Sequence, residues 1–385
     1  MKRTLPGISL LLSLAVIPAS LHAQAPEKTS ATLAATLSPP GGPWAVAATA
    51  STVVVGAPYG PAAYVYERNQ GGTNRWGQTR KLAPVTPNDD RFGWSVAIAG
   101  DTIAVGENFG GNIGEGVVYI FERNKGGAGK WGQVKRIPAP DPSLLGGFGE
   151  SVALSGDTLV VGTSILDAAY VLSRNKGGKN QWGVVKKLEG PSNSFFGISV
   201  GVSGDLAVVG TDAKAAYLFN RNQGGANQWG LVKTFTAPDS GGSEFGSVVA
   251  VSGLTVALGA PRCTPIYGPG IDTGAAGCVF VYGRNQGGPA AWGLIKKLFS
   301  PDAYRFRYFG SSVAISGDVI VAGSPAEFQK GSACLFSRNL GGPNTWGAVA
   351  LWQSDNDSFG VSSAVAGDTA VVGQSGTAFV FRVNP

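Results

Sequence analysis

Short apolar runs recur along the chain, and each one ends at a turn signal after four to eight residues. Residues 92–137 contain a clear example, in which Gly100-Asp101 is a typical two-residue hairpin turn and the Gly-rich segment 124–127 is a second turn. The runs in this unit are Ser95–Ala99, Thr102–Gly106, Val117–Glu122 and Trp131–Ile137. Their length and β-branched content predict four antiparallel strands joined by hairpins.

The same unit repeats through the chain. Each copy has a Phe-Gly pair, a Gly-Asp-like turn, an Arg-Asn-x-Gly-Gly turn and then a Trp-Gly pair. The turn glycines are Gly100, Gly156, Gly204, Gly253, Gly317 and Gly367. Consecutive ones lie 48 to 64 residues apart, a period that fits one four-stranded blade of a β-propeller. The fold class predicted is therefore all-β, a propeller of four-stranded antiparallel blades.

The copies of each strand predict how the ring closes. The first three strands occur seven times, because a first unit begins irregularly at Pro43-Trp44, where Phe-Gly is expected. The Trp-Gly fourth strand occurs only six times, and no copy follows Phe381. Ser30–Ser38 precedes the first unit and has no other role. We expect seven blades, with this N-terminal strand completing the C-terminal blade and removing two exposed ends at once.

Composition agrees with many short strands and narrows the chemistry. The chain has 59 glycines and only 14% charged residues, and its one histidine is His22. Because His22 lies in a segment that we expect to be removed, the mature chain should lack the commonest general base and every His-ligated metal site. No spacing of residues indicates a cofactor, a metal ion or a catalytic group.

Residues 1–23 resemble a secretory signal peptide, which leaves 24–385 as the propeller domain. Lys2 and Arg3 precede an apolar stretch from Ile8 to Leu21, and small residues follow it. This stretch is too short to cross a bilayer. We therefore expect a secreted, periplasmic or cell-surface protein without membrane insertion. The recurring lysines, such as Lys186 and Lys296, fall in the outermost strand and indicate edge protection rather than nucleic-acid binding.

The repeated residues also carry a family resemblance. Phe-Gly followed by Gly-Ala-Pro, as at residues 56–58 and 259–261, resembles the FG-GAP repeats of the integrin α-chain propeller. The resemblance implies a seven-bladed fold and binding to protein or glycan ligands outside the cell. Several integrin blades hold calcium in an Asp-rich loop. Here the matching connection is a two-residue turn, too short to surround a calcium ion, so we do not expect those calcium sites.

Candidate binding residues lie where the copies differ. Because strand direction alternates, the uniform Gly-Asp and Arg-Asn-x-Gly-Gly turns share one face, and the variable second-to-third-strand and blade-to-blade loops share the other. We expect ligands on this variable face, where aromatic and Arg residues are typical of interaction hot spots. The candidates are Arg262, Tyr267, Asp272, Tyr304, Arg305, Arg307, Asn108 and Phe109. The recurrent Trp and Phe residues are instead expected to pack between blades, with the recurrent Arg over the Trp face.

The chain has three cysteines, so one thiol stays unpaired whichever two form a disulfide within the chain. Cys263 and Cys278 flank a long insertion, and Cys334 falls in a predicted third strand. Connectivity cannot be deduced from sequence, so a bond of Cys278 to Cys334 stays open. We expect the Cys263–Cys278 bridge, because it would pin the insertion.

Four interpretations of function remain, and the last is a propeller that forms part of a larger surface assembly without chemistry of its own. The first is a binding, adhesion or protein-interaction scaffold, which the repeats and the single variable face favour. The second is a lectin, although no polar ligand repeats in the variable loops. The third is a lyase or hydrolase that works without histidine, for which no pair of carboxylates stands out.

Overall fold

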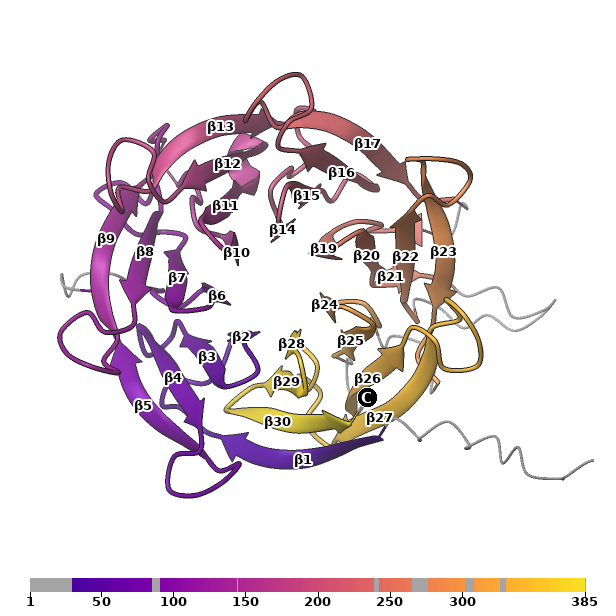
Figure 1. The fold of residues 1–385 in the computed structure, drawn as a ribbon, viewed down its shortest axis with the longest axis horizontal. Coiled ribbons are helices and arrows are strands. Elements are labelled where there is room, and N and C mark those ends of the chain that lie inside the picture. The colour runs from indigo at the N-terminus through magenta and orange to yellow at the C-terminus, as the bar shows by residue number, and fades with distance from the viewer. Residues whose placement is uncertain are drawn as a thin grey trace, which may run out of the picture.

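The computed structural model describes residues 30–84, 91–143, 145–238, 242–264, 276–301, 308–325 and 330–384. Seven four-stranded antiparallel sheets stand around a central opening as the blades of a β-propeller (Figure 1). The fold class predicted from the repeats is confirmed. The expected signal peptide, residues 1–23, lies outside the described residues.

Blades 1 to 6 run from the central opening to the perimeter in chain order, and blade 7 ends at the perimeter with the N-terminal strand β1. Blades 1 to 3 are β2 (Ala45–Ala48), β3 (Thr52–Ala57), β4 (Ala62–Arg68), β5 (Trp76–Leu82); β6 (Ser95–Ala99), β7 (Thr102–Glu107), β8 (Val117–Glu122), β9 (Gly132–Pro138); and β10 (Ser151–Ser155), β11 (Thr158–Thr163), β12 (Ala168–Ser173), β13 (Gly183–Glu189). Blades 4 and 5 are β14 (Val200–Ser203), β15 (Leu206–Gly210), β16 (Ala215–Asn220), β17 (Gly230–Thr236); and β19 (Val248–Ser252), β20 (Thr255–Ala260), β22 (Cys278–Arg284), β23 (Trp292–Leu298). Blades 6 and 7 are β24 (Ser312–Ser316), β25 (Val319–Ser324), β26 (Gly331–Ser337), β27 (Gly347–Ser354); and β28 (Ser362–Ala366), β29 (Thr369–Gln374), β30 (Thr377–Asn384), β1 (Ser30–Leu37). A two-stranded sheet of β18 (Gly242–Ser243) and β21 (Arg262–Cys263), and a 3₁₀ turn at Ser164–Leu166, lie in the connections.

The N-terminal strand closes the ring, as the strand tally predicted. β1 pairs antiparallel with β30 from Ser30↔Asn384 to Leu37↔Ala378 and forms the outer strand of blade 7. One detail of the expectation is wrong. Ala45 pairs with Gly56 as Ser95 pairs with Gly106, so Trp44 matches Trp94 rather than the glycine of Phe-Gly.

The core consists of seven apolar layers, each between two successive blades, among the described residues. Trp182 of blade 3, for example, packs with Val118 and Ile120 of blade 2. The Phe of each Phe-Gly pair is also buried in such a layer. These residues are Phe92, Phe148, Phe196, Phe245, Phe309 and Phe359. The recurrent aromatics thus hold neighbouring blades together, as the repetition indicated.

Close backbone contact at the glycines sets how tightly adjacent blades approach. A Cβ on Gly106 would lie 2.1 Å from the Gly149 carbonyl oxygen of the next blade, so no larger residue fits there. Ser95 donates a hydrogen bond from its hydroxyl to the same carbonyl at 2.7 Å. The equivalent bond from Ser151 to the Gly197 carbonyl is 2.8 Å long. The Phe-Gly and Gly-Ala-Pro glycines are therefore requirements of blade-to-blade packing.

The recurrent Arg fastens most blades to the one before them. Arg123 lies over the Trp131 ring, 4.6 Å from its centroid, and pairs with Asp101 of its own hairpin turn at 2.8 Å. It also donates to the Thr52 hydroxyl of blade 1 at 3.1 Å and pairs with Glu67 there. Arg174, Arg221 and Arg338 repeat the contacts with a Trp ring, a turn Asp and a preceding-blade Thr.

Loss of the closing strand should weaken the whole ring. A protein that begins at residue 41 lacks β1 and leaves β30 as an exposed edge, whereas one that begins at residue 26 keeps the strand. We expect the shorter protein to lose about 10 °C or more of its thermal unfolding midpoint by circular dichroism, because blade 7 then has only three strands and β30 loses its pairing partner. Midpoints that agree within 2 °C would contradict closure by β1.

The Arg contacts can be tested with two equivalent positions that differ in environment. Arg123→Ala removes charge-assisted hydrogen bonds to two blades and should cost about 2 kcal/mol of unfolding free energy. Arg284 holds the same position in blade 5, where the turn Asp is replaced by Leu254, and its side chain is exposed. Arg284→Ala should therefore change the free energy by less than about 0.5 kcal/mol in urea titrations. Equal losses would show that the network does not stabilise the ring.

Candidate functional site

A pocket of about 610 Å³ lies at the central opening and is lined by the first strands of all seven blades. Three consecutive positions at the first strand of each blade line this pocket. The residue type is nearly constant from blade to blade at two of these positions and varies at the third. The innermost wall is a ring of Val46, Val96, Val152, Val200, Val249, Val313 and, in blade 7, Ser363. Next to it lies the Ser position that fastens neighbouring blades. The mouth is formed by the residue that directly follows Phe-Gly.

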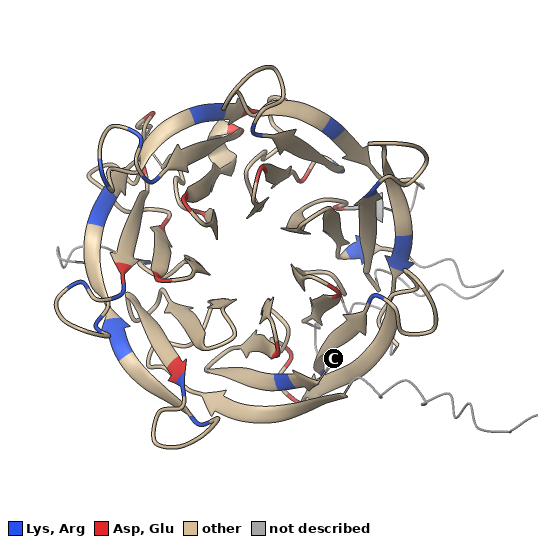
Figure 2. Ribbon diagram, in the orientation of Figure 1, with Lys and Arg blue, Asp and Glu red and all other residues tan. Residues whose placement is uncertain are grey.

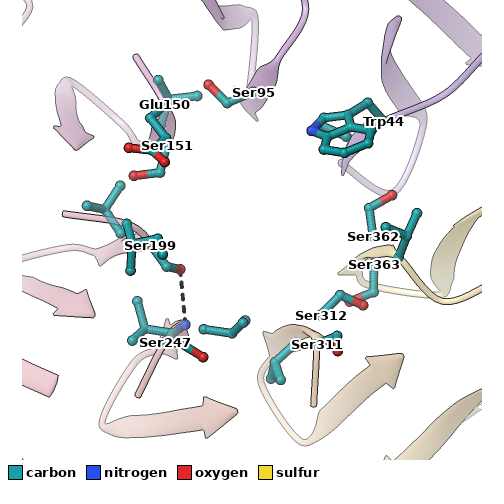
Figure 3. Close-up of a pocket in the computed structure, with 18 of the residues that line it drawn as sticks. Trp44, Ser95, Glu150, Ser151, Ser199, Ser247, Ser311, Ser312, Ser362 and Ser363 are labelled. Carbon is teal, nitrogen blue, oxygen red and sulfur yellow. Dashed lines mark hydrogen bonds between the residues drawn. The ribbon is translucent and has the colours of Figure 1, made fainter. Parts of the chain in front are cut away.

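The mouth position differs in nearly every blade. From blade 1 to blade 7 it is Trp44, Trp94, Glu150, Ile198, Ser247, Ser311 and Val361. It lies at the start of each first strand, on the variable face. Because its flanking residues are uniform and bear the packing, this position is free to vary chemically. The opening is thus asymmetric, with Trp44 on one side and Glu150 on the other (Figure 3).

The mouth beside blades 1 and 2 is aromatic. Trp44 and Trp94 have ring centroids 4.9 Å apart, and Tyr59 meets the Trp44 ring edge-on at 6.0 Å. The Arg91 guanidinium lies 5.4 Å from the Trp94 ring and 4.6 Å from the Phe109 ring. Tyr59 is 69% exposed and Trp44 is 37% exposed. We call Trp44, Tyr59, Arg91, Trp94 and Phe109 the aromatic patch.

Carboxylates occupy the mouth beside blades 3 to 5, where Glu150, Asp212 and Glu244 line the pocket. Burial raises the pKa of Glu150, although hydrogen bonds from the Ser164 amide at 3.3 Å and its hydroxyl at 2.5 Å act in the opposite direction. Burial also raises the pKa of Glu244, while Arg262, with its Nε 3.0 Å from Glu244 Oε1, lowers it. This side of the mouth therefore presents a cluster of carboxyl groups opposite the aromatic patch.

The structure places the predicted binding residues in different environments. Arg262 is exposed and paired to Glu244 at the mouth, and Phe109 lies in the aromatic patch. Asn108 is only 4% exposed, and its side-chain oxygen has no hydrogen-bond partner among the described residues, so it offers no open binding surface. The other candidates, Tyr267, Asp272, Tyr304, Arg305 and Arg307, lie outside the described residues.

Trp44, Trp94 and Glu150 of the mouth were not among the predicted binding residues. A signal for them exists in the sequence, since the residue after Phe-Gly varies while its neighbours repeat. Variation at one position is less conspicuous than an insertion in a long loop.

Cys263 and Cys278 form a disulfide, the pair expected from the sequence, with Cα atoms 5.7 Å apart. The bond joins β21 to the first residue of β22, directly behind Arg262. Cys334 is buried in the layer between blades 5 and 6. The bridge therefore fixes the segment that carries Arg262 beside the mouth.

Two serines of blade 7 lie in the channel wall, and their hydroxyl oxygens are buried without a hydrogen-bond partner in the described part of the chain. Ser362 occupies the position of Ser95 and Ser151, which donate to the carbonyl of a Phe-Gly glycine in the next blade. The blade next to Ser362 is blade 1, which has Pro43 at that glycine position. Ser363 replaces a valine of the inner ring. Within the same described ranges, no group of three His, Cys, Asp or Glu residues is arranged to hold a metal ion.

Comparison with known families agrees with this architecture. Residues 76–121, 131–178 and 292–336 match the FG-GAP repeat family. The chain contains FG-GAP repeats. Each matched segment runs from the outer strand of one FG-GAP blade through the third strand of the next, so the sequence repeat is offset from the structural blade. The fold is that of an integrin α-like propeller, and such a fold supports a protein-interaction scaffold in general.

No curated protein matches the sequence of this FG-GAP propeller. The described residues contain no helix long and apolar enough to cross a membrane.

The buried carboxyl of Glu150 predicts a pH dependence with a definite sign. Because its pKa is raised in the folded state, the folded protein binds this proton more tightly than the unfolded chain does. The stability from the protonated group is fully present below the ordinary carboxyl range and is lost as pH rises through the raised pKa. Glu150→Gln should therefore increase the thermal midpoint more at pH 7 than at pH 4.

Glu115 supplies the opposite case. The Ile113 amide, at 2.9 Å, lowers the pKa of Glu115, so Glu115→Gln should lower the midpoint at pH 7 and change it least at acidic pH. A Glu150→Gln protein that is less stable than the parent at pH 7 would contradict the assignment.

Proposed function

We propose that this protein is an exported scaffold that binds a partner protein at the mouth of its central channel. The observation that carries the proposal is the exposed aromatic patch. Aromatic and Arg side chains dominate interaction hot spots, and a soluble surface rarely exposes several large rings side by side without a binding role. The patch is built by five residues from two adjacent blades, so the scaffold presents it as a fixed surface.

The polar surroundings of the aromatic patch complete an interface of the usual kind. The Arg262–Glu244 pair and Asp212 border the mouth away from the patch. A central apolar anchor with a polar rim is typical of protein–protein contacts. The disulfide supports the Arg262 side, and the propeller supports the other, so little order has to be gained on binding.

The site of action proposed is the cell surface or the space outside the inner membrane. Support comes from the signal-like residues 1–23 and from the Cys263–Cys278 disulfide, because such bonds persist in oxidising compartments. Adhesion to another cell or surface is one form that this binding could take.

A carbohydrate ligand is the second candidate. It is favoured by the position of Trp44 across the opening from Glu150, with the hydroxyls of Ser362 and Ser363 in the channel wall. Pockets that combine an apolar platform with a few converging polar groups suit small ligands. A glycan array distinguishes the two candidates.

Removal of exposed rings should abolish partner binding without loss of the fold. We expect Trp44→Ala and Tyr59→Ala each to weaken partner binding at least tenfold, the effect of a hot-spot residue. Their exposure makes a change in thermal midpoint above a few degrees unexpected for Tyr59→Ala. The measurement is quantitative capture from the secreted fraction of the source organism, followed by titration of the captured protein.

Leu254→Ala is the matched control, because this exposed side chain lies in a hairpin turn on the uniform face. It should retain full binding. Partner capture that survives both aromatic substitutions, or that is lost equally with Leu254→Ala, would place the interface elsewhere. Selective binding of neutral glycans that depends on Trp44 would favour the lectin instead.

A further inference from the structure

The perimeter of the propeller carries a second surface, unrelated to the channel mouth. Basic side chains lie on the outer strands of blades 1 to 5 (Figure 2). They are Arg80, Lys81, Lys135, Arg136, Lys186, Lys187, Lys233, Lys296 and Lys297. Glu189 is the one carboxylate on these five strands. We call these nine residues the basic belt.

The basic belt occupies the same register in each blade. Arg80 pairs with Val65, and Lys135, Lys186, Lys233 and Lys296 occupy the equivalent position opposite the third strand. The next residue is again basic in four of these blades and lies opposite an aromatic ring, as Arg136 does opposite Tyr119. The charges therefore follow the circumference as a continuous arc over five consecutive blades.

Edge protection alone does not explain this distribution. Lysine on an edge strand discourages strand-to-strand aggregation, so it is most needed on aliphatic edges. The outer strands of blades 6 and 7, β27 and β1, have no basic residue, although β1 exposes Leu33 to 57%. The belt thus ends where protection would matter most.

Like charges also meet at the seams between blades. Val65 and Tyr119 belong to one apolar layer, so Arg80 and Arg136, which lie opposite them, project at the same seam between blades 1 and 2. By the same register, Lys233 and Lys297 project at the seam between blades 4 and 5. An anion that lies between two such cations is attracted by both of them.

At one seam the printed contacts show carboxylates of the protein itself beside the basic side chains. Between blades 2 and 3, Lys187 Nζ lies 2.8 Å from an Asp141 oxygen and 3.2 Å from a Glu189 oxygen. The Tyr170 hydroxyl donates to the same Asp141 carboxylate at 2.8 Å. By contrast, Arg80, Lys186, Lys233 and Lys296 make no ion pair with any residue in the described ranges. The seam at Lys187 shows how a carboxylate can be bound at the others.

We propose that the basic belt binds an anionic polysaccharide whose carboxylates occupy the seams. A flexible linear chain can follow the convex perimeter, whereas a flat bilayer would touch only one or two blades. Duplex DNA is too stiff to follow so tight a curve, and the exposed neighbours of the cations, such as Val184, Leu231 and Leu294, are aliphatic rather than the aromatic platforms on which single-stranded bases stack. The choice of a polysaccharide rests on the proposed export, but the surface is independent of the aromatic patch.

The test measures binding of the full propeller to polygalacturonate, with neutral dextran and a 30-base-pair DNA duplex as comparisons. We expect binding to polygalacturonate at 20 mM NaCl, none to dextran, and weaker binding to DNA. The variant Arg80→Gln/Lys186→Gln/Lys233→Gln/Lys296→Gln should lose at least tenfold in affinity. The slope of log affinity against log salt should fall by about 3 when four cations no longer neutralise the polymer.

A matched control removes the same charge from another place. Lys125, Lys130, Lys176 and Lys179 are exposed in the Arg-Asn-x-Gly-Gly turns, and their replacement by Gln should weaken binding less than threefold. Equal losses in the two variants would mean that net charge alone attracts the polymer and would overturn the proposal. Absence of binding at 20 mM NaCl, or tighter binding to the DNA duplex, would overturn it too.

If the fourfold variant is unstable, Arg80→Gln/Lys233→Gln should still lose at least threefold in affinity for polygalacturonate. Trp44→Ala should bind the polymer normally, which separates this result from any failure of the proposed partner site.

Discussion

A blade of this propeller has two apolar faces and no core of its own, so each blade is stable only between two neighbours. That constraint explains the distribution of the repeated residues. Phe-Gly, the Gly-Ala-Pro glycine and the fastening serine all act across blade boundaries, where a Cβ on Gly106 would collide with the next blade. It also explains why the ring is closed by β1, since an unclosed ring would leave one apolar face of two blades without a partner.

The same constraint determines where chemical variety is tolerated. In the described residues, the inner valine recurs in six blades, the serine position in five and the Arg–Trp–Asp contacts in four. The residue after Phe-Gly points into the channel mouth and bears none of this packing. It can therefore be Trp in one blade and Glu in another without cost to the scaffold. The repeated residues hold the blades together, and residues at the variable positions form the proposed partner site.

The outer strands present a different balance, because they are paired on one edge only and face solvent. In blades 1 to 5 they bear cations at one register, and at the seam beside Lys187 the protein supplies carboxylates of its own. The channel mouth and the basic belt are thus separate surfaces on one rigid body. One would contact a partner at the axis while the other would hold a polymer at the circumference.

The seven-bladed fold and its closure were predictable because both follow from local, repeated patterns. The spacing of the turn glycines indicated the blades, and the missing seventh Trp-Gly strand indicated the role of Ser30–Leu37. Single-residue detail was less accessible, and the position of Trp44 relative to Phe-Gly was predicted one residue out of register.

What the sequence by itself determined was the scaffold, since each strand, turn and packing residue is specified within its own repeat and confirmed by its copies. What only the tertiary structure decided was which unrepeated residues meet. Trp44 and Trp94 are far apart along the chain and come together only because blades 1 and 2 are adjacent at the axis, and Arg91 joins them over the Trp94 ring. Arg262 reaches Glu244 because β21 pairs with β18, whereas Asn108, in an equally variable loop, is folded inward and buried. Exposure and proximity depend on the closed ring, and no single repeat contains that information.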